Sequence, residues 1–186
     1  MAAPRENRAV FRPERSLTCQ PLPESATGPK PPAMAQSEFT LKLADDTATA
    51  ALGARLGAAA RAGDVVALYG DLGAGKTTLA RSLIRHLVGP NTEAPSPTFT
   101  LVQTYSSPAF PIWHFDLYRL EHPGEARELG LEEAVDGLAL IEWPERLGAY
   151  LPAQRLEIRL SYDGAGRIAR LVDFDDWSTR IDGDWR

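Results

Sequence analysis

The sequence lacks the residues and segments that several large classes of protein require. It has one cysteine, Cys19, among 186 residues, which excludes an internal disulfide and a disulfide-stapled secreted scaffold. One cysteine and three scattered histidines also provide no structural zinc cluster. No stretch approaches the roughly 18 consecutive apolar residues that a transmembrane helix needs. We therefore expect a cytoplasmic protein without membrane association.

A surplus of positive charge is also missing. Lys and Arg total 20 against 25 Asp and Glu, which gives a net charge of −5. The first 33 residues hold five basic and three acidic side chains, a net +2, which leaves −7 for the remaining residues. Proteins that bind nucleic acid by themselves usually carry a basic surplus. The charge therefore argues against direct nucleic-acid binding as the main task.

Composition divides the chain into one domain and two flanking tails. Residues 1–33 contain seven of the 15 prolines and one short apolar cluster, Val10-Phe11. Such a segment cannot bury enough apolar surface to offset the entropy lost on ordering, so we expect a disordered Pro-rich tail. Residues 34–175 have the length of a single domain, and residues 176–186 are expected to form a C-terminal tail.

Within the domain, strand-like runs alternate with helical periodicities. The spacing of Ala48, Leu52, Leu56 and Ala59 predicts a helix that Asp45 or Asp46 caps and Gly63 ends. Two further helical stretches are expected, at about residues 76–88 and 124–135. Strands are expected at residues 39–43, 65–69, 101–105, 112–117 and 138–141, and as a hairpin at 155–162 and 167–174. This order predicts a single α/β domain with a mixed sheet flanked by helices.

One motif dominates the sequence: residues 70–77 match G-x-x-x-x-G-K-[ST] between an apolar run and an amphipathic helix. Its glycines permit positive φ values, which let successive N–H groups surround an anion at a helix N-terminus. Lys76 supplies a charge for the β- and γ-phosphates, and the Thr77 hydroxyl can bind Mg²⁺. The motif predicts a P-loop NTPase that binds a nucleoside triphosphate with Mg²⁺.

A P-loop protein also needs a carboxylate at a strand end to hold Mg²⁺ or a water. Asp116 and Glu142 each end an apolar run, and their residue types alone do not decide between the two roles. Thr98 either senses the γ-phosphate or belongs to a rigid proline turn. His114 is interpreted as a strand residue rather than a general base. Trp143 either closes a strand or belongs to a partner surface.

Four blocks together resemble the TsaE (YjeE) family of small bacterial ATPases: residues 70–78, 96–102, 114–120 and 141–145. The resemblance covers about residues 39–174. It implies a weak, partner-gated ATPase that acts with the TsaB–TsaD pair in forming threonylcarbamoyladenosine in tRNA. Such a protein meets tRNA only through its partners, which is compatible with its acidic domain.

The resemblance also implies roles for individual residues. Catalysis is expected to depend on Lys76, Asp116 and Glu142, and Thr77 and Glu142 are expected to hold Mg²⁺. Asp46 and Gly166 are expected near the adenine of ATP. The remaining nucleotide contacts are expected from the loop and the switch-like segment: Leu72, Gly73, Ala74, Gly75, Lys76, Thr77 and Thr98.

Two other functions are compatible with the motif. A P-loop small-molecule kinase typically carries arginines in a lid over the phosphates, for which Arg119, Arg127 and Arg146 are available. A nucleotide switch without meaningful hydrolysis would need Lys76 and not Asp116. Phosphorylation of a metabolite that depends on ATP would favour the first alternative.

Overall fold

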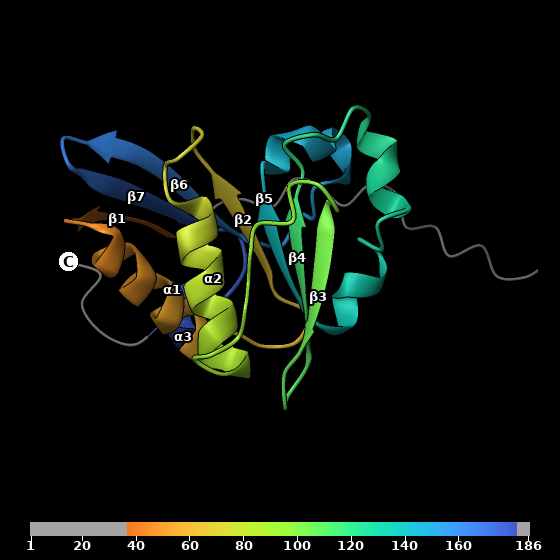
Figure 1. The fold of residues 1–186 in the computed structure, drawn as a ribbon, viewed down its shortest axis with the longest axis horizontal. Coiled ribbons are helices and arrows are strands. Elements are labelled where there is room, and N and C mark those ends of the chain that lie inside the picture. The colour runs from red at the N-terminus through yellow and green to blue at the C-terminus, as the bar shows by residue number, and fades with distance from the viewer. Residues whose placement is uncertain (1–36, 182–186) are drawn as a thin grey trace, which may run out of the picture.

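The computed structural model of the protein describes residues 37–181, and the tail expected at residues 1–33 lies outside them (Figure 1). The first half contains β1 (Ser37–Leu43), α1 (Asp46–Ala59), β2 (Val65–Tyr69), α2 (Lys76–Val88), β3 (Val102–Ser106) and β4 (Pro111–Asp116). The second half contains the 3₁₀ helices η1 (Pro123–Arg127), η2 (Glu133–Asp136) and η3 (Pro144–Tyr150), the strands β5 (Leu138–Glu142), β6 (Leu156–Asp163) and β7 (Gly166–Asp173), and the helix α3 (Trp177–Arg180).

The seven strands form one mixed sheet in the order β1-β7-β6-β2-β5-β4-β3. Strand β2 runs parallel to both β5 and β6, and β4 runs parallel to β5. The other pairs are antiparallel, including the expected β6–β7 hairpin. Central parallel strands are covered on both faces, which is why β2 and β5 are apolar runs. The predicted α/β fold with a mixed sheet is confirmed.

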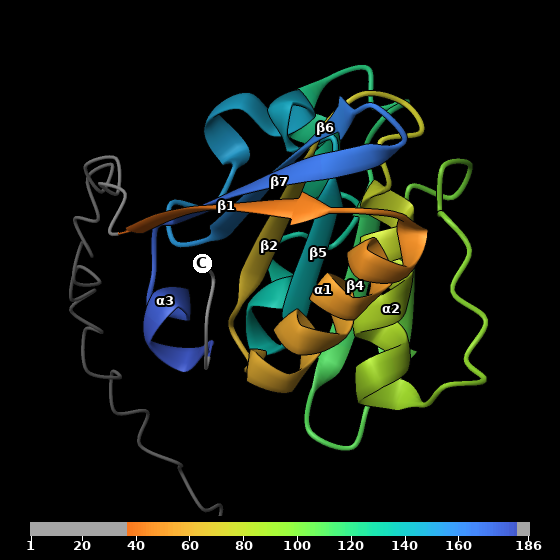
Figure 2. The ribbon, with the colours of Figure 1, turned by 90° about the vertical axis from the view of Figure 1, so that its left-hand side faces the viewer.

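Two layers cover this sheet. Helices α1 and α2 lie side by side against one face, and Figure 2 shows them to one side when the sheet is viewed from its β1 edge. Leu68, Ile112 and Leu140 belong to the core cluster on that side, together with buried residues of both helices. Phe115 and Ile141, which alternate with them along the strands, pack in a second cluster with residues of the 3₁₀ helices. No helix within residues 37–181 has the length and apolarity that crossing a membrane requires.

Two helix predictions need correction. Asp45 caps α1 by accepting a hydrogen bond from the Ala48 amide at 2.8 Å, but the helix ends at Ala59 and not at Gly63. Gly63, with φ of 90°, instead makes the turn into β2. The helical stretch expected at residues 124–135 is wrong as one element, because η1 and η2 are separate 3₁₀ helices. Gly130 lies between them with φ of 84°, outside the right-handed helical region, and separates them.

The packed domain extends beyond residue 175, where a C-terminal tail was expected to begin. Trp177 is fully buried in the core cluster that contains α1 and α2. The Arg180 guanidinium donates to both carboxylate oxygens of Asp64, at 2.8 and 2.9 Å, and to the Ala59 carbonyl at 3.0 Å. Residues 177–181 therefore fasten α1 to the start of β2. The sequence carries no periodic signal for this, since α3 has only one turn.

Candidate nucleotide-binding site

The glycine-rich loop connects the end of β2 to the first residue of α2. Gly70, Gly73 and Gly75 all have positive φ, of 137°, 78° and 105°. Gly75 directly precedes the helix in the left-handed region, which favours glycine. A Cβ atom at Gly70 would collide with the Leu160 carbonyl of β6. The chain therefore turns tightly against the sheet before α2 begins, as the motif predicts.

Lys76 places a buried positive charge at the centre of this loop. Its Nζ atom donates to the carbonyls of Gly70 and Asp71, at 2.6 and 2.9 Å, and lies 3.9 Å from the centre of the Trp143 ring. Burial lowers the pKa of the Lys76 ammonium below its ordinary value, while Glu142 and Asp116 oppose that shift. A phosphate that reached Nζ would replace neutral carbonyl oxygens with a charged ligand.

Glu142, at the end of β5, connects the sheet to the first turn of α2. Its Oε2 atom accepts a hydrogen bond of 2.9 Å from the Thr77 hydroxyl. Its Oε1 atom lies 2.9 Å from Nε2 of His114, which is fully buried in β4. The two residues expected to hold Mg²⁺ are therefore in direct contact.

Asp116, at the end of β4, is aligned with Glu142 in the parallel pair β4–β5. Its Oδ2 atom accepts hydrogen bonds from the hydroxyls of Ser96 and Thr98, at 2.5 and 2.6 Å. Its Oδ1 atom accepts from the Tyr118 amide at 3.1 Å. Two hydroxyls of the segment that contains Thr98 therefore bind a buried carboxylate. This contact is more than a rigid proline turn alone would require.

The donor set of this site suits a hard cation. Asp116 and Glu142 are buried, yet within residues 37–181 neither forms an ion pair with arginine or lysine. Mg²⁺ prefers carboxylate, hydroxyl and phosphate oxygens. The described residues contain no group of three or more His, Cys, Asp or Glu side chains that could hold a metal by themselves. The residues present fit an Mg²⁺ ion that arrives with nucleotide phosphates, as is usual for this metal.

Most of the predicted residues line one hollow of about 300 Å³ over the loop. Ser96 and Trp143 line it as well. The only signal for Ser96 in the sequence is that it belongs to the same block as Thr98. For Trp143 the sequence allows two interpretations, the end of a strand or a partner surface. Ala74, in the loop itself, is fully buried and does not line the hollow. The predicted residues that line the hollow are Leu72, Gly73, Gly75, Lys76, Thr77, Thr98, Asp116 and Glu142.

Asp46 and Gly166 lie outside the lining of this hollow and reach the loop through Arg167. The Arg167 guanidinium donates to the carbonyls of Ala74 and Gly166, at 3.1 and 3.0 Å. It also lies 3.7 Å from the Asp46 carboxylate, whose side chain is 76% exposed. The structure thus brings α1, β7 and the loop together, although nothing in the spacing of the sequence points to Arg167.

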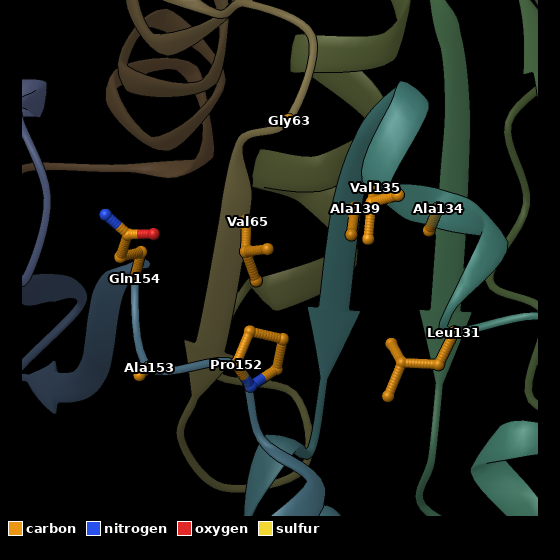
Figure 3. Close-up of a pocket in the computed structure, with 9 residues that line it drawn as sticks. All are labelled: Gly63, Val65, Leu131, Ala134, Val135, Ala139, Pro152, Ala153 and Gln154. Carbon is orange, nitrogen blue, oxygen red and sulfur yellow. The ribbon is translucent and has the colours of Figure 1, made fainter. Parts of the chain in front are cut away.

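A second hollow of about 390 Å³ lies where β2 and β5 begin, at the opposite end of these strands. Figure 3 shows Val65 and Ala139 between Pro152, Ala153 and Gln154 on one side and Leu131, Ala134 and Val135 on the other. Gly63 completes the lining, and none of these residues is charged. This hollow is the larger of the two, but its apolar lining does not suit a phosphate. The chemistry of the lining residues, rather than the volume, therefore favours the loop as the candidate nucleotide site.

The mixed sheet and the strand–loop–helix unit define a P-loop NTPase-type fold. The crystal structure of Bacillus subtilis YdiB is similar, with a TM-score of 0.64 and 29% sequence identity over 77% of this chain and 89% of that chain.

The chain belongs to the TsaE family, described as "Threonylcarbamoyl adenosine biosynthesis protein TsaE", which matches residues 43–170. A protein of Rickettsia felis named tRNA threonylcarbamoyladenosine biosynthesis protein TsaE is 46% identical over 121 residues, which cover 64% of this chain and 71% of the relative. The protein of the same name from Nostoc sp. is 42% identical over 140 residues, which cover 72% of this chain and 85% of the relative. The predicted family is confirmed.

Proposed function

We propose that the protein binds ATP with Mg²⁺, hydrolyses it slowly, and acts with TsaB and TsaD in forming threonylcarbamoyladenosine in tRNA in the cytoplasm. Family membership supports the pathway. The observation that carries the ATPase is the arrangement of Asp116 and Glu142, two buried carboxylates without an arginine or lysine ion pair within residues 37–181, beside Lys76 and the glycine-rich loop. A divalent cation would compensate the two carboxylates of such a site, and the phosphates would give Lys76 an anionic partner.

Each residue has a distinct task in this proposal. Lys76 leaves the carbonyls of Gly70 and Asp71 and binds the β- and γ-phosphates. Thr77 and Glu142 would hold Mg²⁺, which when bound neutralises charge on the phosphates. Asp116 orients the attacking water, since a carboxylate held near the phosphates can accept a hydrogen bond from the nucleophile.

Ser96 and Thr98 link this task to the nucleotide state. Both hydroxyls donate to the same oxygen of Asp116 in the present structure. A γ-phosphate that drew the Thr98 hydroxyl away would free that oxygen to accept from water. The segment would then report on the γ-phosphate while it prepares Asp116 for hydrolysis.

Exposed apolar side chains around the loop support control by partners. Leu72 is 73% exposed on the loop, and Phe99, next to Thr98, is 81% exposed with the Arg119 guanidinium 4.3 Å from its ring centre. Tyr118 is exposed as well, and its ring lies 5.0 Å from that of Trp143. Exposed apolar groups gathered at a site are typical of a protein interface. We propose that the TsaB–TsaD pair docks here, so that tRNA contacts this protein only indirectly.

The kinase alternative finds less support. Arg127 pairs with Glu132 on the surface at 2.8 Å, and Arg119 lies over Phe99, so two of the three lid candidates have other contacts. A switch without hydrolysis would not need Asp116 and Glu142 to be buried together at the loop. Of the three functions, hydrolysis under partner control therefore accounts best for the two buried carboxylates at the loop and the exposed apolar side chains around it.

The test is steady-state hydrolysis of ATP with Mg²⁺, alone and with purified TsaB–TsaD, with Lys76→Ala as the blank. We expect slow turnover by the protein alone and a clear change in rate with the partners. A rate that equals the blank under both conditions would contradict the ATPase. Turnover that the partners leave unchanged would contradict partner control.

A further inference from the structure

His114 is a buried histidine in which one ring nitrogen contacts Glu142 and the other has no partner among the described residues. Its Nε2 atom lies 2.9 Å from Oε1 of Glu142, and its side chain is fully buried. Its Nδ1 atom is buried and has no hydrogen-bond partner within residues 37–181. An ionised carboxylate only accepts hydrogen bonds, so Nε2 carries the hydrogen and donates to Glu142.

The register of the sheet explains how His114 reaches this carboxylate. In the parallel pair β4–β5, His114 is level with Leu140, and Asp116 is level with Glu142. Ile112, His114 and Asp116 alternate along β4 and therefore share one face of the sheet, the face on which α2 packs. His114 thus contacts Glu142 diagonally from deeper in the core. Thr77 contacts the other oxygen of the same carboxylate from α2.

Packing alone does not explain a histidine at this position. A buried polar atom without a partner costs free energy, so an apolar side chain of similar size would serve the core better than an imidazole with a free Nδ1. The only polar contact that the His114 side chain makes among the described residues is the one to Glu142. The hydrogen bond to the Glu142 carboxylate therefore explains why this position holds a histidine.

We infer that His114 is a positioning residue that holds Oε1 of Glu142, so that Oε2 faces Thr77 and an incoming Mg²⁺. This inference rests on the proposed function of the site. A glutamate side chain has three rotatable bonds, and fixing one oxygen from behind limits where the other can point. Residues that hold a metal ligand in this way typically contribute a factor of about 10–100 to metal affinity or activity.

The test compares variants of His114 that keep or remove the donor. His114→Phe removes it at similar volume, whereas the amide nitrogen of His114→Gln can take the place of Nε2. Ile112→Ala is the matched control, because it damages the same face of β4 without touching either carboxylate. Calorimetry measures ADP binding over a magnesium series, and hydrolysis gives the magnesium concentration for half-maximal rate.

We expect His114→Phe to raise the required magnesium concentration by about 10–100-fold. Its ADP binding without magnesium should equal that of the wild type, and His114→Gln should recover most of the loss. Ile112→Ala should lower the melting temperature and leave the magnesium requirement unchanged. If His114→Phe fails to fold, His114→Asn, whose shorter amide does not reach Glu142, carries the same expectation.

Three results would overturn the inference. The first is a wild-type magnesium requirement in the variants that lack the donor. The second is an equal shift in Ile112→Ala, which would assign the effect to packing. The third is a His114→Gln variant no better than His114→Phe. A wild-type protein that binds no nucleotide with Mg²⁺ would instead contradict the proposed function on which the inference rests.

Discussion

Two pairs of carboxylates are buried to the same degree but are held in different ways. Asp64 and Glu157 are 5% and 4% exposed, and Asp116 and Glu142 are 3% and 2% exposed. Asp64 receives two hydrogen bonds from Arg180, and Glu157 receives them from Arg155 and Arg159. Asp116 and Glu142 contact hydroxyls, a backbone amide and an imidazole instead.

The difference separates carboxylates that arginine compensates within the protein from those that we propose bind a cation. A buried charge is costly unless a partner compensates it, and an arginine partner completes the compensation within the protein. At the ends of β4 and β5 the nearby cation is Lys76, which contacts loop carbonyls rather than either carboxylate. A divalent cation from outside would compensate the two carboxylates there, and phosphates would give Lys76 an anionic partner.

The largest effect that we predict is that of Lys76→Ala on hydrolysis. Removing the one buried cation of the loop should lower the rate of ATP hydrolysis by about 10³-fold or more, because the charge on the phosphates is then uncompensated. Steady-state phosphate release measures this, with circular dichroism to confirm folding. A folded variant with more than a tenth of wild-type activity would contradict the assigned role.

Glu142→Gln should lower hydrolysis by about 10²–10³-fold, since one charged contact to the metal is lost. The fold should be unaffected or slightly stabilised, because the change removes a buried charge that has no arginine or lysine ion pair in the described part of the chain. Nucleotide binding without magnesium should be retained. Equal hydrolysis in the variant and the wild type would remove Glu142 from the metal site.

Glu157→Gln makes the same chemical change in the other pair and should have the opposite outcome. Burial raises the pKa of Glu157, but hydrogen bonds from Arg155 and Arg159 outweigh it and hold the pKa below its ordinary value of 4.5. We expect the variant to lose about 1–3 kcal/mol of stability at pH 7 and to keep its hydrolysis rate.

The loss in Glu157→Gln should depend on pH. A lowered pKa in the folded state contributes stability that is fully present above the unfolded value and lost as the pH falls through the folded value. The difference in unfolding free energy between wild type and variant should therefore shrink below about pH 4.5. Urea unfolding at several pH values measures this, and a difference that grows on acidification would show that the arginines do not stabilise the carboxylate.

The smallest effect is expected at the apolar hollow beside β2 and β5. Val135 is exposed on its rim, so Val135→Asp should change stability by no more than about 0.5 kcal/mol. Hydrolysis by this variant should equal that of the wild type, because the change lies at the opposite end of the strands from Lys76. A large loss of activity would show that the two ends of the sheet are not independent.

The sequence predicts the parts of this arrangement that depend on local pattern. The glycines of the loop, the apolar runs of β2 and β5 and the carboxylates that end β4 and β5 are all visible as motifs or periodicities. Their positions in one site follow from parallel pairing, because parallel strands place their carboxyl ends at the same edge. Local pattern and parallel pairing together are therefore enough to predict that these elements share one site.

What could not be predicted depends on contacts between distant residues. The partnership of His114 with Glu142 spans two strands, and its only local trace is an alternation that fits any strand. Arg167 reaches the loop from β7, 93 residues along the chain. The burial of Trp177 likewise depends on where α1 lies, which no local pattern encodes.

The central claim is that nucleotide phosphates bind at Lys76 together with Mg²⁺. Its most direct test is an equilibrium titration of the full chain with ATP and Mg²⁺ by calorimetry, with Lys76→Ala and Val135→Asp measured in parallel. We predict saturable binding to the wild type and to Val135→Asp, and none to Lys76→Ala. Equal binding to wild type and Lys76→Ala, or its loss in Val135→Asp alone, would contradict the claim.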